Sequence, residues 1–117
     1  MIQVTPHMKV LVAQEPLDFR KGIDGTAAVC RNALDRDPNC GHIFVFRNRS
    51  RTMIRLLVHD GHGIWLMNKR VSAGRFRYWL DADGDTTCWL DPHQLQVLLA
   101  GDDWRRTSPT AYWRKVA

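Results

Sequence analysis

The sequence has few cysteines and no long apolar run, and each absence argues against a class of protein. The three cysteines, Cys30, Cys40 and Cys88, form no CxxC pair, and their odd number argues against a disulfide framework. A reducing cytoplasm is therefore the expected location. The apolar stretch nearest the start, Met8 to Ala13, is short and is broken by Lys9, so we expect no signal peptide and no membrane partner.

Catalytic and metal-binding patterns are also missing or weak. The best candidate is "HDGHG" (59–63), because two histidines and a carboxylate can bind a metal or act as base and orienter. Asp60 followed by Gly61 is equally a standard hairpin turn, and a turn explains the whole stretch. The "DADGD" segment (81–85) lacks the spacing of a calcium loop. The sequence therefore predicts no catalytic residue, no metal ligand, no cofactor and no enzymatic activity.

Charge of one sign is scarce in each of two neighbouring segments. Residues 42–80 carry eight basic side chains against Asp60 alone, whereas residues 81–104 carry six aspartates and no lysine or arginine. Residues 105–117 are again basic and contain two aromatic residues, Tyr112 and Trp113. A sorted charge distribution is better evidence for a charged partner than a scattered one. The alternative is that the basic and acidic segments pair with each other within the fold.

Periodicity predicts a small α+β domain over residues 1–104, followed by a mobile tail over residues 105–117. Strands are expected at 8–13, 42–46, 53–59, 64–70 and 86–90. The middle three, joined by short turns, form an antiparallel β-meander. In residues 53–59, Ile54, Leu56 and Val58 should face one side of the sheet, and Arg55 and Leu57 the other.

About two helices are expected to pack on this meander. The first runs from Asp18, as N-cap, to about Asp35, with Arg20 and Asp24 as a surface ion pair. The second covers residues 91–101, with Asp91 as N-cap, Pro92 at the first position, Gln94 three residues after the cap and Gly101 as terminator. The aromatic residues Trp65, Phe76 and Trp79 are interpreted as core.

Several stretches, in this order, resemble a known family. They are "DFRKG" (18–22), "DP" (37–38), "GHIFVFRNRSR" (41–51), "RLLVHDGHGIWLMNKR" (55–70) and "GRF" (74–76). The chain is similar over about residues 8 to 101 to the small second-reading-frame accessory protein of the bacterial insertion-sequence sixty-six family. It departs from that family at Arg55, where lysine is usual, at His59, where an aromatic residue is usual, and at Leu80, where proline is usual. The resemblance implies a role in transposition beside a larger, separate transposase.

The basic segment then becomes the candidate contact with DNA, at the transposon ends. Arginine suits bidentate phosphate contacts, and "RNRSR" (47–51) is longer than a minimal hairpin turn, so its charges need a counter-charge. The residues predicted to bind DNA are Arg47, Arg49, Arg51, Arg55, Lys69, Arg70 and Arg75.

Two functions remain open at this point. In the first, the chain is a non-catalytic, DNA-binding accessory factor of transposition that grips phosphates without a helix-turn-helix or zinc finger. In the second, it is an adaptor that docks on the transposase and binds no DNA itself, through an apolar patch near Trp65 or through the 91–101 helix. The counter-charge is then an acidic protein, including the acidic segment of a second copy in a homo-oligomer.

Overall fold

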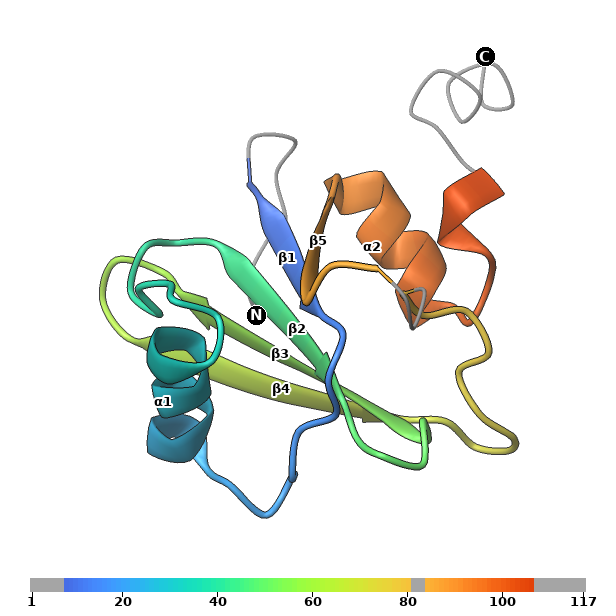
Figure 1. Ribbon diagram of the computed structural model, residues 1–117, viewed down its shortest axis with the longest axis horizontal. Helices are drawn as coiled ribbons and strands as arrows, with labels where there is room; N and C mark the ends of the chain where they lie inside the picture. Colours follow the sequence, from blue (N-terminus) through green and yellow to red (C-terminus); the bar gives the residue numbers. More distant parts are fainter. Residues whose placement is uncertain (1–7, 81–83, 107–117) are drawn as a thin grey trace.

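Five strands, two α-helices and one 3-10 helix form the described part of the chain, residues 8–80 and 84–106, in the computed structural model (Figure 1). In chain order these elements are β1 (Val10–Ala13), α1 (Ile23–Asn32), β2 (Ile43–Arg47), β3 (Met53–His59), β4 (Ile64–Arg70), β5 (Thr87–Leu90), α2 (Pro92–Leu99) and η1 (Trp104–Arg106). The predicted strand 53–59 and strand 64–70 have the bounds that the sequence indicated.

The strands make one sheet in the order β4-β3-β2-β1-β5. The pairs β2–β3 and β3–β4 are antiparallel, which confirms the predicted meander. Strand β1 pairs in parallel with β2, and β5 is antiparallel to β1. Because parallel neighbours need a long crossover, α1 and its flanking loops connect β1 to β2. The fold is therefore α+β, as predicted, with a mixed rather than a purely antiparallel sheet.

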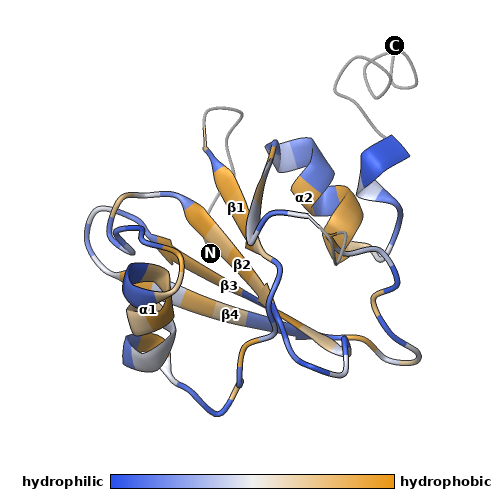
Figure 2. Ribbon diagram, viewed as in Figure 1, coloured by the Kyte–Doolittle hydropathy of each residue, from blue (hydrophilic) through white to orange (hydrophobic). Residues whose placement is uncertain are grey.

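Both faces of the sheet are covered, and Figure 2 shows the apolar strands that lie between the two layers. On the α1 face, Leu11, Phe44 and Leu57 pack with Ala27 and Cys30 of the helix. On the opposite face a larger cluster surrounds α2. Its fully or nearly buried members are Val10, Val12, Ile43, Val45, Ile54, Val58, Phe76, Trp79, Leu80, Leu90, Leu95, Leu98 and Trp104. The predicted alternation along β3 is confirmed, because Ile54 and Val58 belong to one cluster and Leu57 to the other.

Helix α2 begins as the sequence predicts. The Asp91 carboxylate accepts from the Gln94 amide at 2.8 Å, and the Gln94 side chain accepts from the Asp91 amide at 3.0 Å, which completes a capping box. Gly101 follows the helix with a φ of 83°, a left-handed conformation that favours glycine.

Helix α1 begins later than predicted. It runs from Ile23 with Gly22 as N-cap, so the prediction of a helix starting at Asp18 is wrong. The Asp18 carboxylate is occupied by Arg20 instead, whose amide donates to Oδ1 at 3.0 Å and whose guanidinium lies 2.7 Å from Oδ2. The expected Arg20–Asp24 pair is wrong for the same reason.

Of the three aromatic residues predicted as core, Phe76 and Trp79 are buried, whereas Trp65 on the edge strand β4 is 38% exposed. Residues 107–117 of the predicted tail lie outside the described residues. Arg105 does not belong to a separate tail, because its guanidinium donates to the Trp79 carbonyl at 2.7 Å. Within the described residues, no helix has the length and apolar character needed to cross a membrane.

Candidate nucleic-acid interface

The loop between β2 and β3, residues 48–52, is organised by the side chain of Asn48. Its Oδ1 accepts from the amides of Thr52 and Met53 at 2.9 and 3.1 Å, and its Nδ2 donates to Thr52 Oγ1 at 2.9 Å. Arg51 has a φ of 61°, a left-handed conformation that is uncommon for a side chain larger than asparagine. The loop is thus fixed by hydrogen bonds within itself and is a rigid carrier for its arginines.

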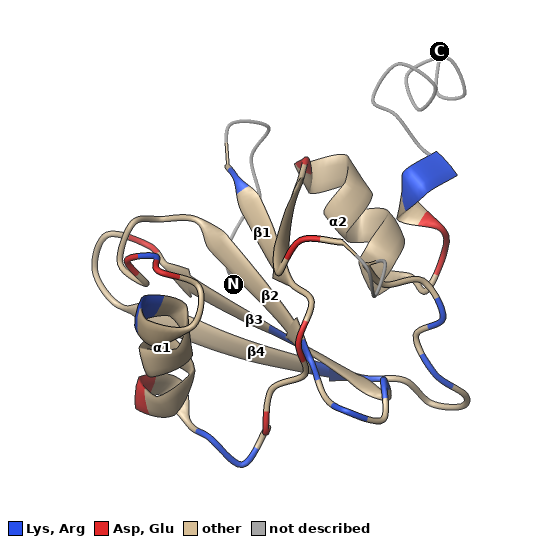
Figure 3. Ribbon diagram, viewed as in Figure 1, with Lys and Arg blue, Asp and Glu red and all other residues tan. Residues whose placement is uncertain are grey.

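The same loop is tied to the segment that follows β4. Thr52 O accepts from the Val71 amide at 3.0 Å, and Arg51 O accepts from the Phe76 amide at 2.7 Å. Arg70, at the end of β4, pairs across the strands with Met53. These contacts place the predicted residues of three segments at one end of the sheet, where Figure 3 shows basic segments close together. We call this group the basic end; its members are Arg47, Arg49, Arg51, Arg70 and Arg75.

No ion pair is found at the basic end within the described residues, although the charge of Glu15 acts on Arg47 and partly opposes the lowering of its pKa. The ion pairs found in the described residues are Arg20–Asp18 and Arg106–Asp103, and neither involves the basic end. The alternative that the basic and acidic segments pair with each other is therefore not seen in residues 8–80 and 84–106; Asp81 and Asp83 lie outside them. Burial lowers the pKa of Arg47, and repulsion from Arg51 lowers it further. Arg49, Arg70 and Arg75 are exposed, whereas Arg47 and Arg51 are half-buried.

Lys69 lies on the other side of β4 from Arg70. It pairs with Ile54, whose side chain belongs to the α2 face, and its Nζ donates to the Leu99 carbonyl at the end of α2. A cation at this position compensates the unpaired carbonyls and the negative end of the helix dipole. The structure therefore gives Lys69 a helix-capping contact, on the same sheet face as Arg47, which pairs with Ile54 from the other side.

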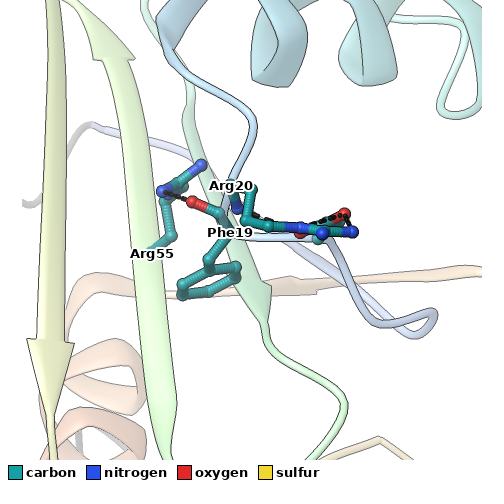
Figure 4. Close-up of polar contacts among 4 residues, drawn as sticks. Phe19, Arg20 and Arg55 are labelled. Atoms are coloured by element: carbon teal, nitrogen blue, oxygen red, sulfur yellow. Dashed lines mark hydrogen bonds and ion pairs between the residues drawn. The ribbon is translucent and has the colours of Figure 1, made fainter.

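Arg55 was predicted to bind DNA, and the structure corrects this. The side chain is buried, with 3% of its surface exposed, beneath the segment before α1. Its Nε donates to Asn68 Oδ1 at 2.8 Å, and its terminal nitrogens donate to Thr26 Oγ1 at 3.0 Å and to Lys21 O. A further bond runs to Phe19 O at 2.9 Å (Figure 4). The guanidinium carbon also lies 4.5 Å from the centre of the Phe19 ring.

All three nitrogens of the Arg55 side chain donate to protein oxygens, and only 3% of the residue is exposed, so phosphate has no access to them. Sequence reasoning missed this role although one signal was present: the alternation placed Arg55 on the same face as Leu57, which is buried. The "DFRKG" segment is now explained as a loop that Arg55 holds against the sheet.

A cleft of about 830 Å³ lies beside the basic end and was not predicted from the sequence. One wall is the segment 16–20, and the other consists of residues 48–50, Met53 and Asn68. Leu17 N donates to Arg47 O at 2.8 Å and so connects the two walls. Because Arg55 fixes both Phe19 and Asn68, the cleft is formed before any ligand arrives.

The residues considered for catalysis serve the turn between β3 and β4. Asp60 Oδ1 accepts from the amides of His62 and Gly63, each at 2.9 Å, and Oδ2 accepts from Trp65 Nε1 at 2.7 Å. The Gly63 amide, the Trp65 indole and the His62 amide together hold the pKa of Asp60 well below its usual range. Within the described residues, no cluster of three histidine, cysteine or acidic side chains is placed to hold a metal ion.

Comparison with known proteins identifies one family, and two of the similar proteins match this chain over most of its length. A model of the family described as IS66 Orf2 like protein matches residues 8–109. The uncharacterized protein y4jC of Sinorhizobium fredii is 37% identical over 106 residues, which cover 91% of this chain and 89% of that protein. The uncharacterized protein y4hO of the same organism is 35% identical over 114 residues, covering 97% and 96% of the two chains. No solved structure matches the chain.

Proposed function

The chain belongs to the family of IS66 Orf2 like proteins, whose role is accessory to transposition, and from that premise we propose that it is a non-catalytic factor that grips DNA phosphates with the basic end. The observation that carries this proposal is a set of arginines, on three connected segments, that form no ion pair among the described residues. Phosphate is the natural counter-charge, because the guanidinium group donates two parallel hydrogen bonds to it.

The geometry of the loop also favours binding. Asn48 and the contacts to Val71 and Phe76 hold the backbone that carries Arg49 and Arg51, so little backbone freedom is lost when phosphate binds. Within the described chain, α2 carries no lysine or arginine, and α1 carries only Arg31. A helix inserted in the major groove is therefore not the mode we propose. Phosphate contacts fix position on the duplex, and DNA shape then supplies any selectivity.

The test is the salt dependence of binding to a labelled duplex, followed by fluorescence anisotropy from about 50 to 200 mM salt. Four phosphate contacts give a slope of about −3.6 in log affinity against log salt, which is a loss of roughly 100-fold over that range. Changing Arg47, Arg49 and Arg51 to Ala is expected to lower both the affinity and the slope.

The matched control is the triple variant Lys9→Ala, Arg31→Ala and Arg36→Ala. It removes the same charge from exposed residues that precede β1 or β2, at the opposite end of the β1–β2 pair. It should retain most of the duplex affinity. Equal losses in the two triple variants would show that net charge alone attracts DNA, and no binding at low salt would reject DNA contact altogether.

A second candidate, docking on the transposase, is favoured by the position of Trp65. This side chain lies on the edge strand β4 and is 38% exposed, although its indole N–H is bound to Asp60. Exposed tryptophans often anchor protein interfaces. If the chain is such an adaptor, Trp65→Ala should weaken binding to the transposase of the same element and leave duplex binding unchanged. Calorimetry measures the binding to the transposase. Trp89→Ala is the control, because Trp89 is 45% exposed on the opposite edge strand, β5.

A further inference from the structure

The cleft beside the basic end combines apolar walls with polar groups at its rim. Leu17, Phe19 and Met53 supply the apolar part, and Asn68 and Arg49 supply donors. Its volume of about 830 Å³ lies within the range of sites that bind small organic groups, about 300 to 1,000 Å³. A phosphate alone needs no apolar wall, so the cleft suits a ligand that also has a flat, weakly polar ring.

Asn68 is the polar group whose orientation the structure fixes. Its Oδ1 accepts from Arg55 Nε at 2.8 Å, which identifies the remaining amide nitrogen as a donor. No hydrogen bond to that nitrogen is found within the described residues, and the side chain is exposed on β4. It is therefore available to an acceptor in the cleft, such as a ring nitrogen or carbonyl of a nucleobase.

Arg55 supplies a positive charge behind the wall. Its guanidinium is bound by neutral oxygens of Phe19, Lys21, Thr26 and Asn68, and no carboxylate contacts it within the described residues. A buried cation without an opposite charge favours an anion nearby. Arg49, exposed at the rim, adds a second positive charge that can reach a phosphate.

Asp18 and Arg20 complete the rim of the cleft. Both oxygens of the Asp18 carboxylate accept from Arg20, at 2.7 to 3.1 Å, so the two side chains form an ion pair and Asp18 does not repel a phosphate. The preference for a nucleotide over a free phosphate therefore comes from the apolar walls and the Asn68 donor. A ligand with a phosphate at one end and a base at the other matches this arrangement.

We propose that the cleft receives an unpaired nucleotide of a DNA strand that continues from the duplex held at the basic end. This inference rests on the proposed function, because the same strand is gripped through its phosphates by the neighbouring arginines. Insertion of a base between Phe19, Leu17 and Met53 adds apolar contact that a paired base cannot make, since it is stacked inside the duplex.

The test compares three labelled DNA probes at one salt concentration: a blunt duplex, the same duplex with a short adenine overhang, and the duplex with an abasic overhang of equal length. The wild-type protein is expected to prefer the adenine overhang over the blunt duplex by about tenfold, the effect of one well-packed base. The abasic overhang keeps the phosphates and loses the base, so it should bind like the blunt duplex.

Two variants locate this preference in the cleft. Asn68→Asp keeps the acceptor for Arg55 and replaces the free donor with a second acceptor oxygen, so the preference for the adenine overhang should disappear. Asn39→Asp is its control, because it adds the same charge at an exposed position in the loop before β2. Met53→Ala removes an apolar wall without changing charge and should lower the preference as well.

The outcomes separate this inference from the proposed function. Equal, salt-dependent binding of the blunt and overhang probes would contradict nucleotide binding in the cleft and would leave the basic end as a phosphate-binding site. Preference for the overhang that survives Asn68→Asp and Met53→Ala would also contradict nucleotide binding in the cleft. The preference for the overhang could also disappear in both variants while the Arg47, Arg49 and Arg51 triple variant binds duplex normally. That result would support nucleotide binding in the cleft and reject phosphate binding by the basic end. Loss of transposase binding in Asn68→Asp, with every DNA affinity unchanged, would make the cleft a protein site.

Discussion

The loop before β3, residues 48–52, and the turn after it, residues 60–63, are each organised by one side chain, Asn48 in the first and Asp60 in the second. In both cases Oδ1 accepts from two backbone amides further along the chain. The amide of Asn48 is neutral and lies among arginines, whereas the carboxylate of Asp60 is charged and lies beside two histidines. The geometry of each turn needs only an acceptor oxygen, so the choice between amide and carboxylate sets the local charge. Asn48, being neutral, adds no negative charge to the basic end.

The largest expected effect is on stability, and it distinguishes Arg55, on strand β3 between the two turns, from Arg49 in the loop before it. Arg55→Leu leaves four oxygen atoms of the protein without their donor, and we expect the free energy of unfolding to fall by about 3 kcal/mol. Urea denaturation measures this change. Arg49→Leu, in the exposed loop, should alter stability by no more than about 0.5 kcal/mol.

For DNA affinity we expect the opposite order, so Arg49→Leu should weaken duplex binding more than Arg55→Leu does. Arg49→Leu removes a phosphate contact, whereas Arg55 has no access to phosphate. Arg55→Lys keeps the charge and one or two of the hydrogen bonds, so its stability should lie between those of the wild type and Arg55→Leu. A stable, folded Arg55→Leu protein with weakened duplex binding would restore Arg55 to the DNA-binding residues and contradict the structure.

The second effect tests the comparison directly by giving the loop the chemistry of the turn. Asn48→Asp keeps both backbone contacts through Oδ1, so the fold should persist. The new carboxylate pairs with the neighbouring arginines, and duplex affinity at low salt should fall by about tenfold, the effect of one lost charged contact. Fluorescence anisotropy measures it, with Asn39→Asp as the control of equal charge. An unchanged affinity would mean that the loop arginines do not contact DNA.

The sequence predicts the meander well because its evidence is local. Alternating residues define β3, and Asp91, Pro92 and Gln94 define the start of α2 without reference to any distant residue. The start of α1 was missed because Asp18 has two possible roles, helix cap or partner of Arg20, and the choice depends on how Arg55 holds the loop between them. The side-by-side placement of β1 and β2 likewise comes from the tertiary fold and not from either strand alone.

In the candidate site too, some features follow from the local sequence and others only from the tertiary fold. The position of Arg47, Arg49 and Arg51 in a hairpin loop follows from the flanking apolar runs. The burial of Arg55 requires knowledge of which helix covers that face, and the exposure of Trp65 requires knowledge that β4 is an edge strand. The cleft depends on contacts between segments about thirty residues apart, such as Leu17 with Arg47, and no local pattern indicates it.

A smaller, pH-dependent effect on stability is expected at the turn of residues 60–63, which Asp60 organises. The pKa of Asp60 is lowered in the folded protein, so its contribution to stability is complete above the ordinary aspartate pKa, near 3.9, and decreases as the pH falls below it. Asp60→Asn lacks this titration. The wild type should therefore lose more stability than Asp60→Asn between neutral pH and about pH 3, measured by urea denaturation.

Asp18, whose pKa is lowered to about 2 mainly by the Arg20 side chain, contributes with the same sign in both proteins. The difference between the two proteins thus isolates Asp60. If the wild type and Asp60→Asn lose the same stability as the pH falls, the turn does not depend on the charge of the carboxylate. Asp60 and Asn48 would then hold their turns in the same way, and the difference in charge would have no effect on stability.

The smallest effect divides the interactions of Asp60 itself. Trp65→Phe keeps an aromatic ring on β4 and removes the indole donor to Oδ2. The pKa of Asp60 should rise but remain below its usual range, because the larger cause, the Gly63 amide, is unchanged. Titration of the Asp60 carboxyl group by NMR measures this shift, and an unchanged pKa would mean that the indole does not donate to Asp60 in solution. If transposase binding survives Trp65→Phe but not Trp65→Ala, the two contacts of Trp65 are separable. The indole N–H then stabilises the turn through Asp60, and the aromatic ring contacts the transposase.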